Sequence, residues 1–248
     1  MQNRYTGDIG DFGKLGLIRV LNSAGLSIGV NWYHTPDESH NGDGRHIGYL
    51  NNEQYQACDM QLWSELKRIV ESGQREITAL DNRDILQATY YSNLLDFSGK
   101  TKAERTKLRS EWHKEALAAL ANIDIVFVDP DNGLIVPSAV GTVKANKYVE
   151  PRELAGYYSQ GSSVIYYQHK ARRTDTFYIE QHKRLLSCPA FDGATGLGLK
   201  FVTTSQRYYF FIIQPKHKEL INQQIQQMMN TAWKEHFCLF SCDKSAYN

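Results

Sequence analysis

The segment Ile123–Val128, followed at once by Asp129 and Pro130, constrains the fold of this 248-residue chain more than any other. Its residues are aliphatic or aromatic apart from Asp124 near the start. A continuous apolar run of this length is typical of a strand that is covered on both faces, as in parallel sheets. Pro130 lacks the amide hydrogen that would extend strand pairing, so the chain turns after Asp129. We therefore predict a central, buried strand with Asp129 at its carboxyl end.

Strand and helix patterns alternate along the rest of the chain, which is typical of an α/β sheet. Further strands are expected at Leu26–Tyr33, Glu76–Leu80, Ala88–Ser92, Ser162–His169, 197–204 and 207–215. Helices are expected at Lys14–Ala24, Gln54–Ser72, Ala103–Ala121, Asp175–Leu186 and Pro215–Trp233. Only two residues separate the last two strands, too few for a crossover connection, so these strands should form an antiparallel hairpin.

The domain organisation follows from length and pattern. A chain of 248 residues fits one large α/β domain. It contains no internal repeat, low-complexity tract or linker rich in proline and serine. We predict a single α/β domain over residues 1–248, with helical insertions near 54–72 and 103–121. Its sheet should be Rossmann-like and mainly parallel, with one reversed strand in the terminal hairpin.

Composition excludes several classes of protein. The formal net charge is +1, so no global positive field indicates a nucleic-acid partner, and any basic surface must be local. Four scattered cysteines are too few for a disulfide framework, and we assign no zinc site. Neither a signal peptide nor an apolar run of about 18 residues is present, which favours a cytoplasmic protein without a membrane span. The sequence does not indicate an oligomeric state.

Polar side chains follow or end three of the predicted strands. Those after the first strand include His34, Asp37, Asp43 and His46. Ligands of open α/β sheets bind outside the carboxyl ends of the strands, so these side chains are candidate site residues. Asp129, Asp131 and Asn132 follow the central strand, and a pair of acidic residues at the end of a buried strand costs solvation unless a ligand uses it. His169 ends the next strand, where it can act as an acid, a base or a ligand near neutral pH.

The N-terminal segment GDIGDFGKLGLI, the strand Ile28–Tyr33, the Asp-Pro turn and the terminal hairpin together resemble the ribosomal-RNA adenine methyltransferases, which act on the exocyclic amine of adenine. Those enzymes begin with a Gly-x-x-x-Asp-x-x-Lys spacing, which Gly7, Asp11 and Lys14 match. The resemblance covers most of the chain in layout and a handful of residues in identity. It implies a methyltransferase-type fold, S-adenosylmethionine as the cofactor and a nucleic acid, RNA or DNA, as the partner.

The resemblance also implies roles for individual residues. Asp129 would receive the amine of a flipped-out base, and Pro130 would set the backbone carbonyl that accepts its second hydrogen. Asp131 and Asn132 stand where the family has a second proline and an aromatic residue that stacks on the base. The predicted catalytic set is Asp129, Pro130, Asp131, Asn132 and His169.

The cofactor site implied by the resemblance lies near the first helix and the first strand. Its predicted residues are Gly7, Asp11, Lys14, Asn31 and His34. After the first strand the family has an acidic residue and a short glycine-rich turn, whereas this chain has Asn31 followed by WYHTPDE. The next glycines, in the stretch NGDG, are candidates for a displaced version of that turn.

Two other functions are consistent with the same residues. Asp129 and Asp131, with His34, Asp37, Asp43 or His46, are oxygen and imidazole ligands that would suit one or two divalent metal ions of a nuclease or phosphodiesterase. The third hypothesis is a noncatalytic module of this fold that binds nucleic acid or protein.

Overall fold

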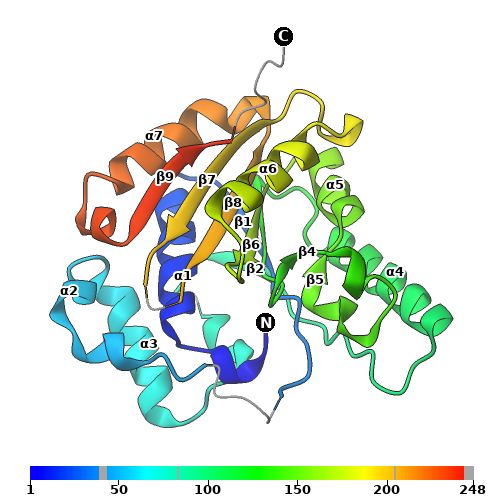
Figure 1. Cartoon of the computed structure of the whole chain (residues 1–248). Helices are drawn as coiled ribbons and strands as arrows, with labels where there is room; N and C mark the ends of the chain where they lie inside the picture. The colour runs from blue at the N-terminus through cyan, green and yellow to red at the C-terminus, as the bar shows by residue number, and fades with distance from the viewer. Residues whose placement is uncertain (39–43, 83, 204, 243–248) are drawn as a thin grey trace.

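The computed structural model describes residues 1–38, 44–82, 84–203 and 205–242, and it places the predicted central strand in the middle of a sheet (Figure 1). Strand β3 (Ile125–Val128) pairs in parallel with β1 (Ile28–Asn31) on one side and with β6 (Ser163–His169) on the other. The strand order is β2-β1-β3-β6-β8-β7-β9. The predicted α/β fold with an antiparallel hairpin is confirmed. The sheet is mixed: β2, β1, β3 and β6 pair in parallel, and the remaining pairings are antiparallel.

The remaining elements surround this core. The other strands of the large sheet are β2 (Ala88–Tyr91), β7 (Thr195–Phe201), β8 (Arg207–Ile213) and β9 (Phe237–Ser241). A separate parallel pair consists of β4 (Gly133–Leu134) and β5 (Tyr148–Val149). The α-helices are α1 (Ile9–Asn22), α2 (Glu53–Gln56), α3 (Met60–Ser72), α4 (Lys102–Ala119), α5 (Pro151–Ser159), α6 (Asp175–Leu186) and α7 (Lys218–Met228). Within the described ranges, no helix has the length and apolar character needed to span a membrane.

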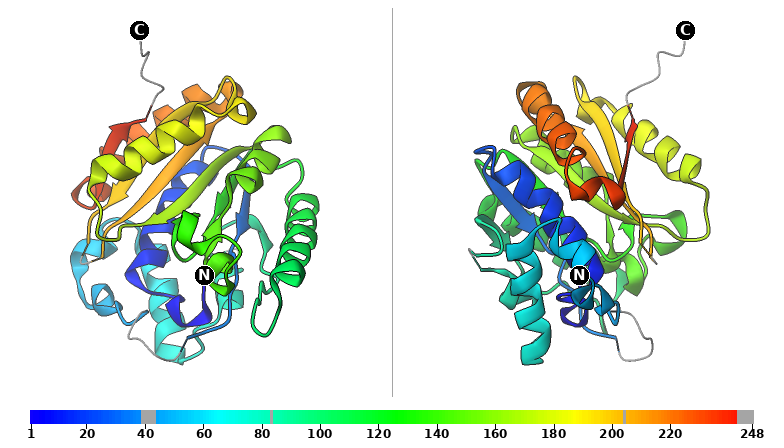
Figure 2. Two further views of the ribbon diagram at one scale, coloured as in Figure 1. Left: turned by 45° about the vertical axis from the view of Figure 1, so that its right-hand side comes forward. Right: turned by 90° about the vertical axis from the view of Figure 1, so that its left-hand side faces the viewer.

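Helices cover both faces of the sheet, and the side chains of β3 alternate between the two cores. Ile125 and Phe127 belong to the core that contains residues of α1, α3 and α7. Val126 and Val128 belong to the core that contains residues of α4, α5 and α6. In the right-hand view of Figure 2, α1 and α7 lie on one side of the sheet and α6 lies on the other. Coverage of both faces explains why the sequence of β3 is continuously apolar.

The reversed strands differ from the prediction. The hairpin of β7 and β8 forms as expected, and β8 runs antiparallel to β6. A second reversed strand, β9, pairs with the outer edge of β7, so two strands are reversed rather than one. The sequence of β9 is short, and several of its residues are half-buried or exposed, as suits an edge strand.

Two predicted elements are also corrected. The segment Glu76–Leu80, predicted as a strand, contains a short 3-10 helix at Ile77–Leu80. Ile77 and Leu80 are both buried, and their spacing of three residues is the one that a 3-10 helix brings to one face. The helix predicted at Pro215–Trp233 is shorter in the structure than in the prediction. Only α7 is α-helical, and a 3-10 turn lies on each side of α7.

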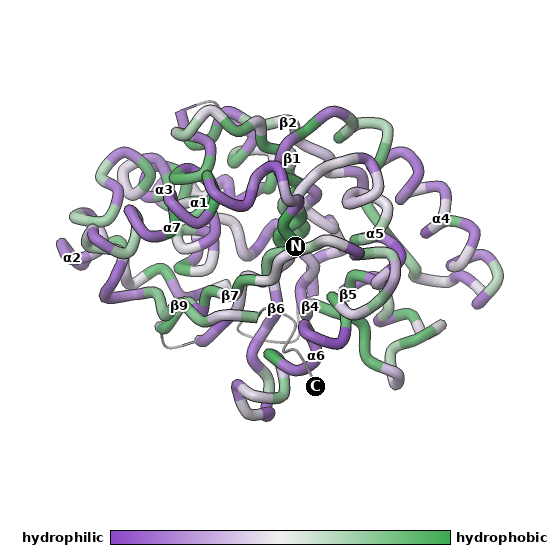
Figure 3. Tube along the Cα trace, turned by 90° about the horizontal axis from the view of Figure 1, so that it is seen from above, coloured by the Kyte–Doolittle hydropathy of each residue, from purple (hydrophilic) through white to green (hydrophobic). Residues whose placement is uncertain are grey.

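The order of the strands fixes where a ligand can bind. From β1 the chain adds β2 on one side and then β3 on the other, so the direction of winding switches between β1 and β3. Open α/β sheets bind ligands in the crevice outside the carboxyl ends of the strands at such a switch point. Figure 3 shows the start of the chain near the centre of the molecule, close to the labels of β1, β4 and β6. The N-terminal segment therefore lies beside this crevice.

A buried histidine in the sheet core makes stability depend on pH. The Nδ1 atom of His182 lies 3.0 Å from the hydroxyl of Tyr166, and its Nε2 atom lies 3.0 Å from the carbonyl oxygen of Phe211. Burial lowers the pKa of His182 to about 3 from its ordinary value of 6.5. Between these values the unfolded chain binds a proton that the folded protein does not, so the free energy of unfolding falls as the pH is lowered.

We predict that His182→Gln removes this contribution. Between pH 6 and pH 4 the wild type should lose about 1.4 kcal/mol of unfolding free energy per pH unit relative to the variant. Urea unfolding of both proteins at several pH values measures the difference. Parallel pH profiles would show that His182 is not held neutral in the folded state.

Candidate functional site

A cavity of about 300 Å³ lies beyond the carboxyl ends of β3 and β6. Its walls come from the first turns through α1, the loop after β1, the turn after β3, the end of β6 and the start of β8. Lys147, just before β5, and Ser205, before β8, also line it. The turn contributes Asp129, Pro130, Asp131 and Asn132, and β6 contributes His169. The cavity therefore brings together all five residues that the sequence predicts as catalytic.

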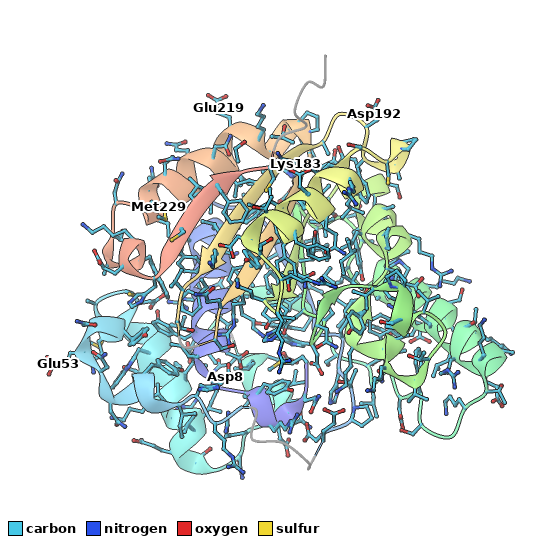
Figure 4. The ribbon with its side chains drawn as sticks, viewed as in Figure 1. Asp8, Glu53, Lys183, Asp192, Glu219 and Met229 are labelled. Carbon is cyan, nitrogen blue, oxygen red and sulfur yellow. The ribbon has the colours of Figure 1, made fainter. Side chains whose placement is uncertain are left out.

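The first turn of α1 forms one wall because Asp8 begins the helix there. The side chain of Asp8 accepts hydrogen bonds from the backbone amides of Gly10, at 2.7 Å, and Asp11, at 3.1 Å. Such a cap satisfies amides that have no partner within the helix. This explains why α1 begins at Ile9, before the predicted start. Figure 4 labels Asp8 at the N-terminal end of α1, beside the first turns of the chain.

Lys14 lies between two carboxylates in the cavity wall. Its Nζ atom lies 2.5 Å from Oδ2 of Asp129 and 2.9 Å from Oδ1 of Asp11. All three side chains are almost completely buried. Asp11 is also tied to the helix entry, because its Oδ2 accepts a hydrogen bond from the backbone amide of Gly7 at 2.8 Å. Residues 115 positions apart thus meet in one ionic cluster.

The cluster determines which groups carry charge. Burial alone lowers the pKa of Lys14, but the carboxylates of Asp11 and Asp129 outweigh it and raise that pKa above its ordinary value. Lys14 is therefore an ammonium ion. Burial raises the pKa of both Asp129 and Asp11 even though Lys14 opposes it. Burial therefore makes each carboxylate a better proton acceptor than an exposed aspartate, although the lysine that they share opposes this effect.

Asp131 has different partners. Its Oδ1 lies 2.7 Å from the amino group of Met1, and its Oδ2 accepts a hydrogen bond from Nε2 of Gln2 at 2.7 Å. The amino group of Met1 also donates to the carbonyl oxygens of Tyr33 and Asp129. Burial opposes ionisation, but the Met1 amino group and its neighbours hold the pKa of Asp131 below its usual value. Asp131 is thus an ionised carboxylate that anchors the first residues against the turn.

The turn after β3 is held by β6. Gly133 adopts φ = 103°, a left-handed conformation that favours glycine. The side-chain oxygen of Gln168 accepts a hydrogen bond from the amide of Leu134 at 2.9 Å, and its Nε2 donates to the carbonyl oxygen of Asn132 at 2.9 Å. These bonds fix the direction in which Asp129 and its neighbours face the cavity. Gln168 is therefore a positioning residue.

The predicted cofactor residues divide into two groups. Asp11 and Lys14 line the cavity, and Gly7 binds Asp11 through its amide. Asn31 is buried at the end of β1, where its Nδ2 donates to the hydroxyl of Tyr157 at 2.8 Å. The Nδ1 atom of His34 lies 3.1 Å from the carbonyl oxygen of Ser92. Neither Asn31 nor His34 belongs to the cavity wall.

The loop after β1 flanks the cavity. Glu38, Gly44 and His46 line it, and Gly44 has φ = 81°. Gly42 of the stretch NGDG falls outside the described residues, as does Asp43. Tyr167, on β6, also lines the cavity.

Sequence reasoning missed Tyr167 and Arg207. Both line the cavity, and both belong to strands whose sequences read as sheet core. The neighbouring residues Tyr208, Tyr209, Phe210 and Phe211 are indeed fully buried, as expected. The sequence gives no direct signal for Arg207, which lies opposite His169 only once β8 is placed antiparallel to β6.

The metal-dependent alternative has less geometric support. In the part of the chain that the structure describes, no group of three or more His, Cys, Asp or Glu residues is arranged to hold a metal ion. Asp129 is paired with Lys14, and Asp131 is paired with the amino group of Met1. Of the other candidate metal ligands, His46 lines the cavity. A carboxylate oxygen of Asp37 instead accepts a hydrogen bond from the main-chain amide of Arg4 at 3.4 Å.

Comparison with known proteins adds no assignment. No protein-family model matches the chain, and no curated protein matches its sequence.

Proposed function

We propose that the protein is a methyltransferase-like enzyme of the cytoplasm that transfers a methyl group from S-adenosylmethionine to an amine of a nucleic-acid base. One observation carries the proposal. The two segments on which the resemblance to ribosomal-RNA adenine methyltransferases rests, Gly7-x-x-x-Asp11-x-x-Lys14 and Asp129-Pro130, meet in a single cavity with Lys14 bonded to Asp129. The cavity lies at the edge of the sheet where this fold class binds ligands.

The side chains of the cavity fit the charged part of S-adenosylmethionine. Its sulfonium and ammonium groups are cations, and the carboxylates of Asp8, Asp11 and Asp129 line the wall around Lys14. Asp11 and Lys14 on α1, with the loop of Gly44 and His46, would hold the cofactor. When bound, S-adenosylmethionine supplies an electrophilic methyl group.

The residues of the turn and of β6 would act on the base. The Asp129 carboxylate accepts a hydrogen bond from the amine and stabilises the positive charge that develops on its nitrogen. The raised pKa of Asp129 suits it to receive the proton that this nitrogen loses. Tyr167 offers a ring at the cavity wall, which suits stacking on a base. His169, on the same wall, is close enough to the turn to assist in binding the base.

Calorimetric titration of the intact protein tests the proposal. We expect S-adenosylmethionine to bind without added metal and to bind equally in the presence of Mg²⁺ or Mn²⁺. Binding of Mg²⁺ or Mn²⁺ alone, accompanied by cleavage of RNA or DNA, would instead support the nuclease. Absence of S-adenosylmethionine binding under all of these conditions would refute the methyltransferase proposal.

A further inference from the structure

Arg207 is a buried cation whose hydrogen-bonding capacity is only partly used. It begins β8 opposite His169, lines the cavity, and is 4% exposed. Its Nε and Nη1 atoms are buried and have no hydrogen-bond partner among the residues that the structure describes. Within those same residues no carboxylate forms an ion pair with it. A buried donor without a partner costs free energy, which a ligand would recover.

The other deeply buried arginine shows what a satisfied guanidinium looks like in this protein. Arg109 is 3% exposed, and its Nε and Nη2 atoms donate to the carboxylate of Glu153 at 2.6 and 2.7 Å. Its remaining donors bond to the carbonyl oxygens of Ala145 and Tyr148. Arg109 therefore needs no ligand. Arg207 is similarly buried and lies on a cavity, but its polar neighbours are the hydroxyl of Tyr167 and the already capped carboxylate of Asp8, and its Nε and Nη1 atoms have no hydrogen-bond partner among the described residues.

The guanidinium of Arg207 lies against the first turn of α1. A Cβ atom on Gly10 would lie 2.8 Å from Nη1 of Arg207, so glycine at this position gives the guanidinium room. The carboxylate of Asp8, which caps the start of α1, already accepts two backbone amides through Oδ1. Arginine with free donors at a cavity wall is suited to an oxyanion, either phosphate or carboxylate.

Basic residues also lie on the loop beside Arg207, where Lys170 is paired with Asp175 at 3.7 Å. The loop after β6 carries Lys170, Arg172 and Arg173, and the amide of Lys170 donates to the carbonyl oxygen of Gln206, next to Arg207. Arg172 and Arg173 are exposed. A cation in the cavity followed by cations on the rim suits a chain of phosphates better than the single carboxylate of a cofactor.

We propose that Arg207 binds a backbone phosphate of a single nucleic-acid strand, and that the loop 170–173 contacts the neighbouring phosphates. This inference rests on the proposed function, because it places the strand so that its base enters the cavity beside Asp129. In this arrangement the carboxylates of Asp8, Asp11 and Asp129 contact the amine of the base and the cofactor. Arg207 contacts the phosphate.

Fluorescence anisotropy with a labelled 12-nucleotide single-stranded RNA tests this assignment. Arg207→Met should weaken RNA binding about 10- to 100-fold, as expected for the loss of a charge-assisted contact. It should also reduce the slope of log affinity against log salt concentration by about one. Arg207→Lys should retain part of the affinity. The control Arg68→Met, on an exposed arginine of α3 paired with Glu65, should bind RNA like the wild type.

Two further measurements separate the possible outcomes. The thermal midpoint of Arg207→Met should be no lower than that of the wild type, because the substitution removes an unsatisfied buried cation. Its affinity for S-adenosylmethionine should change less than threefold. Loss of S-adenosylmethionine binding with unchanged RNA binding would overturn the inference and assign Arg207 to the cofactor carboxylate. RNA binding that depends on Arg207 in a protein that does not bind S-adenosylmethionine would support the inference and refute the proposed methyl donor.

Discussion

Asp129→Asn is expected to lower the rate constant of methyl transfer about 10²- to 10³-fold, the usual cost of removing a group that stabilises charge in the transition state. The amide oxygen of asparagine can still accept a hydrogen bond from Lys14, so the cavity should keep its shape. The neutral amide cannot stabilise a developing positive charge or receive a proton. Transfer of a tritium-labelled methyl group to ribosomal RNA transcribed in vitro measures the rate.

Binding measurements and a control complete this test. The affinity of Asp129→Asn for S-adenosylmethionine should lie within a few-fold of the wild type, so the loss falls on kcat. Asp192→Asn, at an exposed aspartate after α6, should leave the rate unchanged. An Asp129→Asn protein that transfers methyl groups at the wild-type rate would remove Asp129 from the reaction.

Lys14→Met is expected to destabilise the folded protein by about 3–5 kcal/mol, because it leaves two buried carboxylates without their shared cation. Methionine matches the length of the lysine stem, so lost packing contributes little. The pKa of Asp11 and of Asp129 should rise further once Lys14 no longer opposes burial, and the variant should recover stability as the pH is lowered. Urea unfolding at pH 7 and pH 5 measures both effects.

A second substitution distinguishes charge from packing. Adding Asp11→Asn to Lys14→Met removes one of the two unpaired carboxylates and should restore part of the lost stability. The control Lys67→Met breaks an exposed pair with Glu71 on α3 and should cost about 0–1 kcal/mol. A loss of less than about 1 kcal/mol for Lys14→Met would mean that the buried cluster does not form as described.

Much of the fold could be predicted because β3 and the terminal hairpin have distinct patterns. The continuous apolar run of Ile125–Val128 reflects burial on both faces, and the short connection from the end of β7 at Phe201 to the start of β8 at Arg207 leaves no room for a crossover. The edge strand β9 was not predicted, although Phe237–Phe240 is an apolar run. Segment 76–80 was wrongly predicted because a short apolar run does not distinguish a strand from one turn of helix.

The candidate site was predictable where motif and topology agreed. Asp129 follows a recognisable strand, and the spacing of Asp11 and Lys14 identifies α1, but only the fold brings Lys14 to Asp129. Asn31 ends the predicted first strand, yet its side chain is used locally by Tyr157 and Tyr33. Position at a strand end therefore does not determine where the side chain points.

The cationic side of the cavity was not predictable from one sequence. Arg207 precedes six apolar or aromatic residues, and nothing in that run indicates that its first side chain faces a cavity. Arg207 is of interest because its Nε and Nη1 atoms have no hydrogen-bond partner among the described residues. This is apparent only once the fold places Asp8 and Gly10, at the start of α1, beside it.

The central claim is that α1 and the turn after β3 form one ligand site. Hydrogen exchange measured by mass spectrometry, with and without S-adenosylmethionine, tests it most directly. We predict slower exchange on ligand addition in peptides covering both residues 7–16 and residues 127–136, with α4 unchanged as an internal reference. Protection confined to other parts of the chain, or no protection at saturating ligand, would contradict the claim.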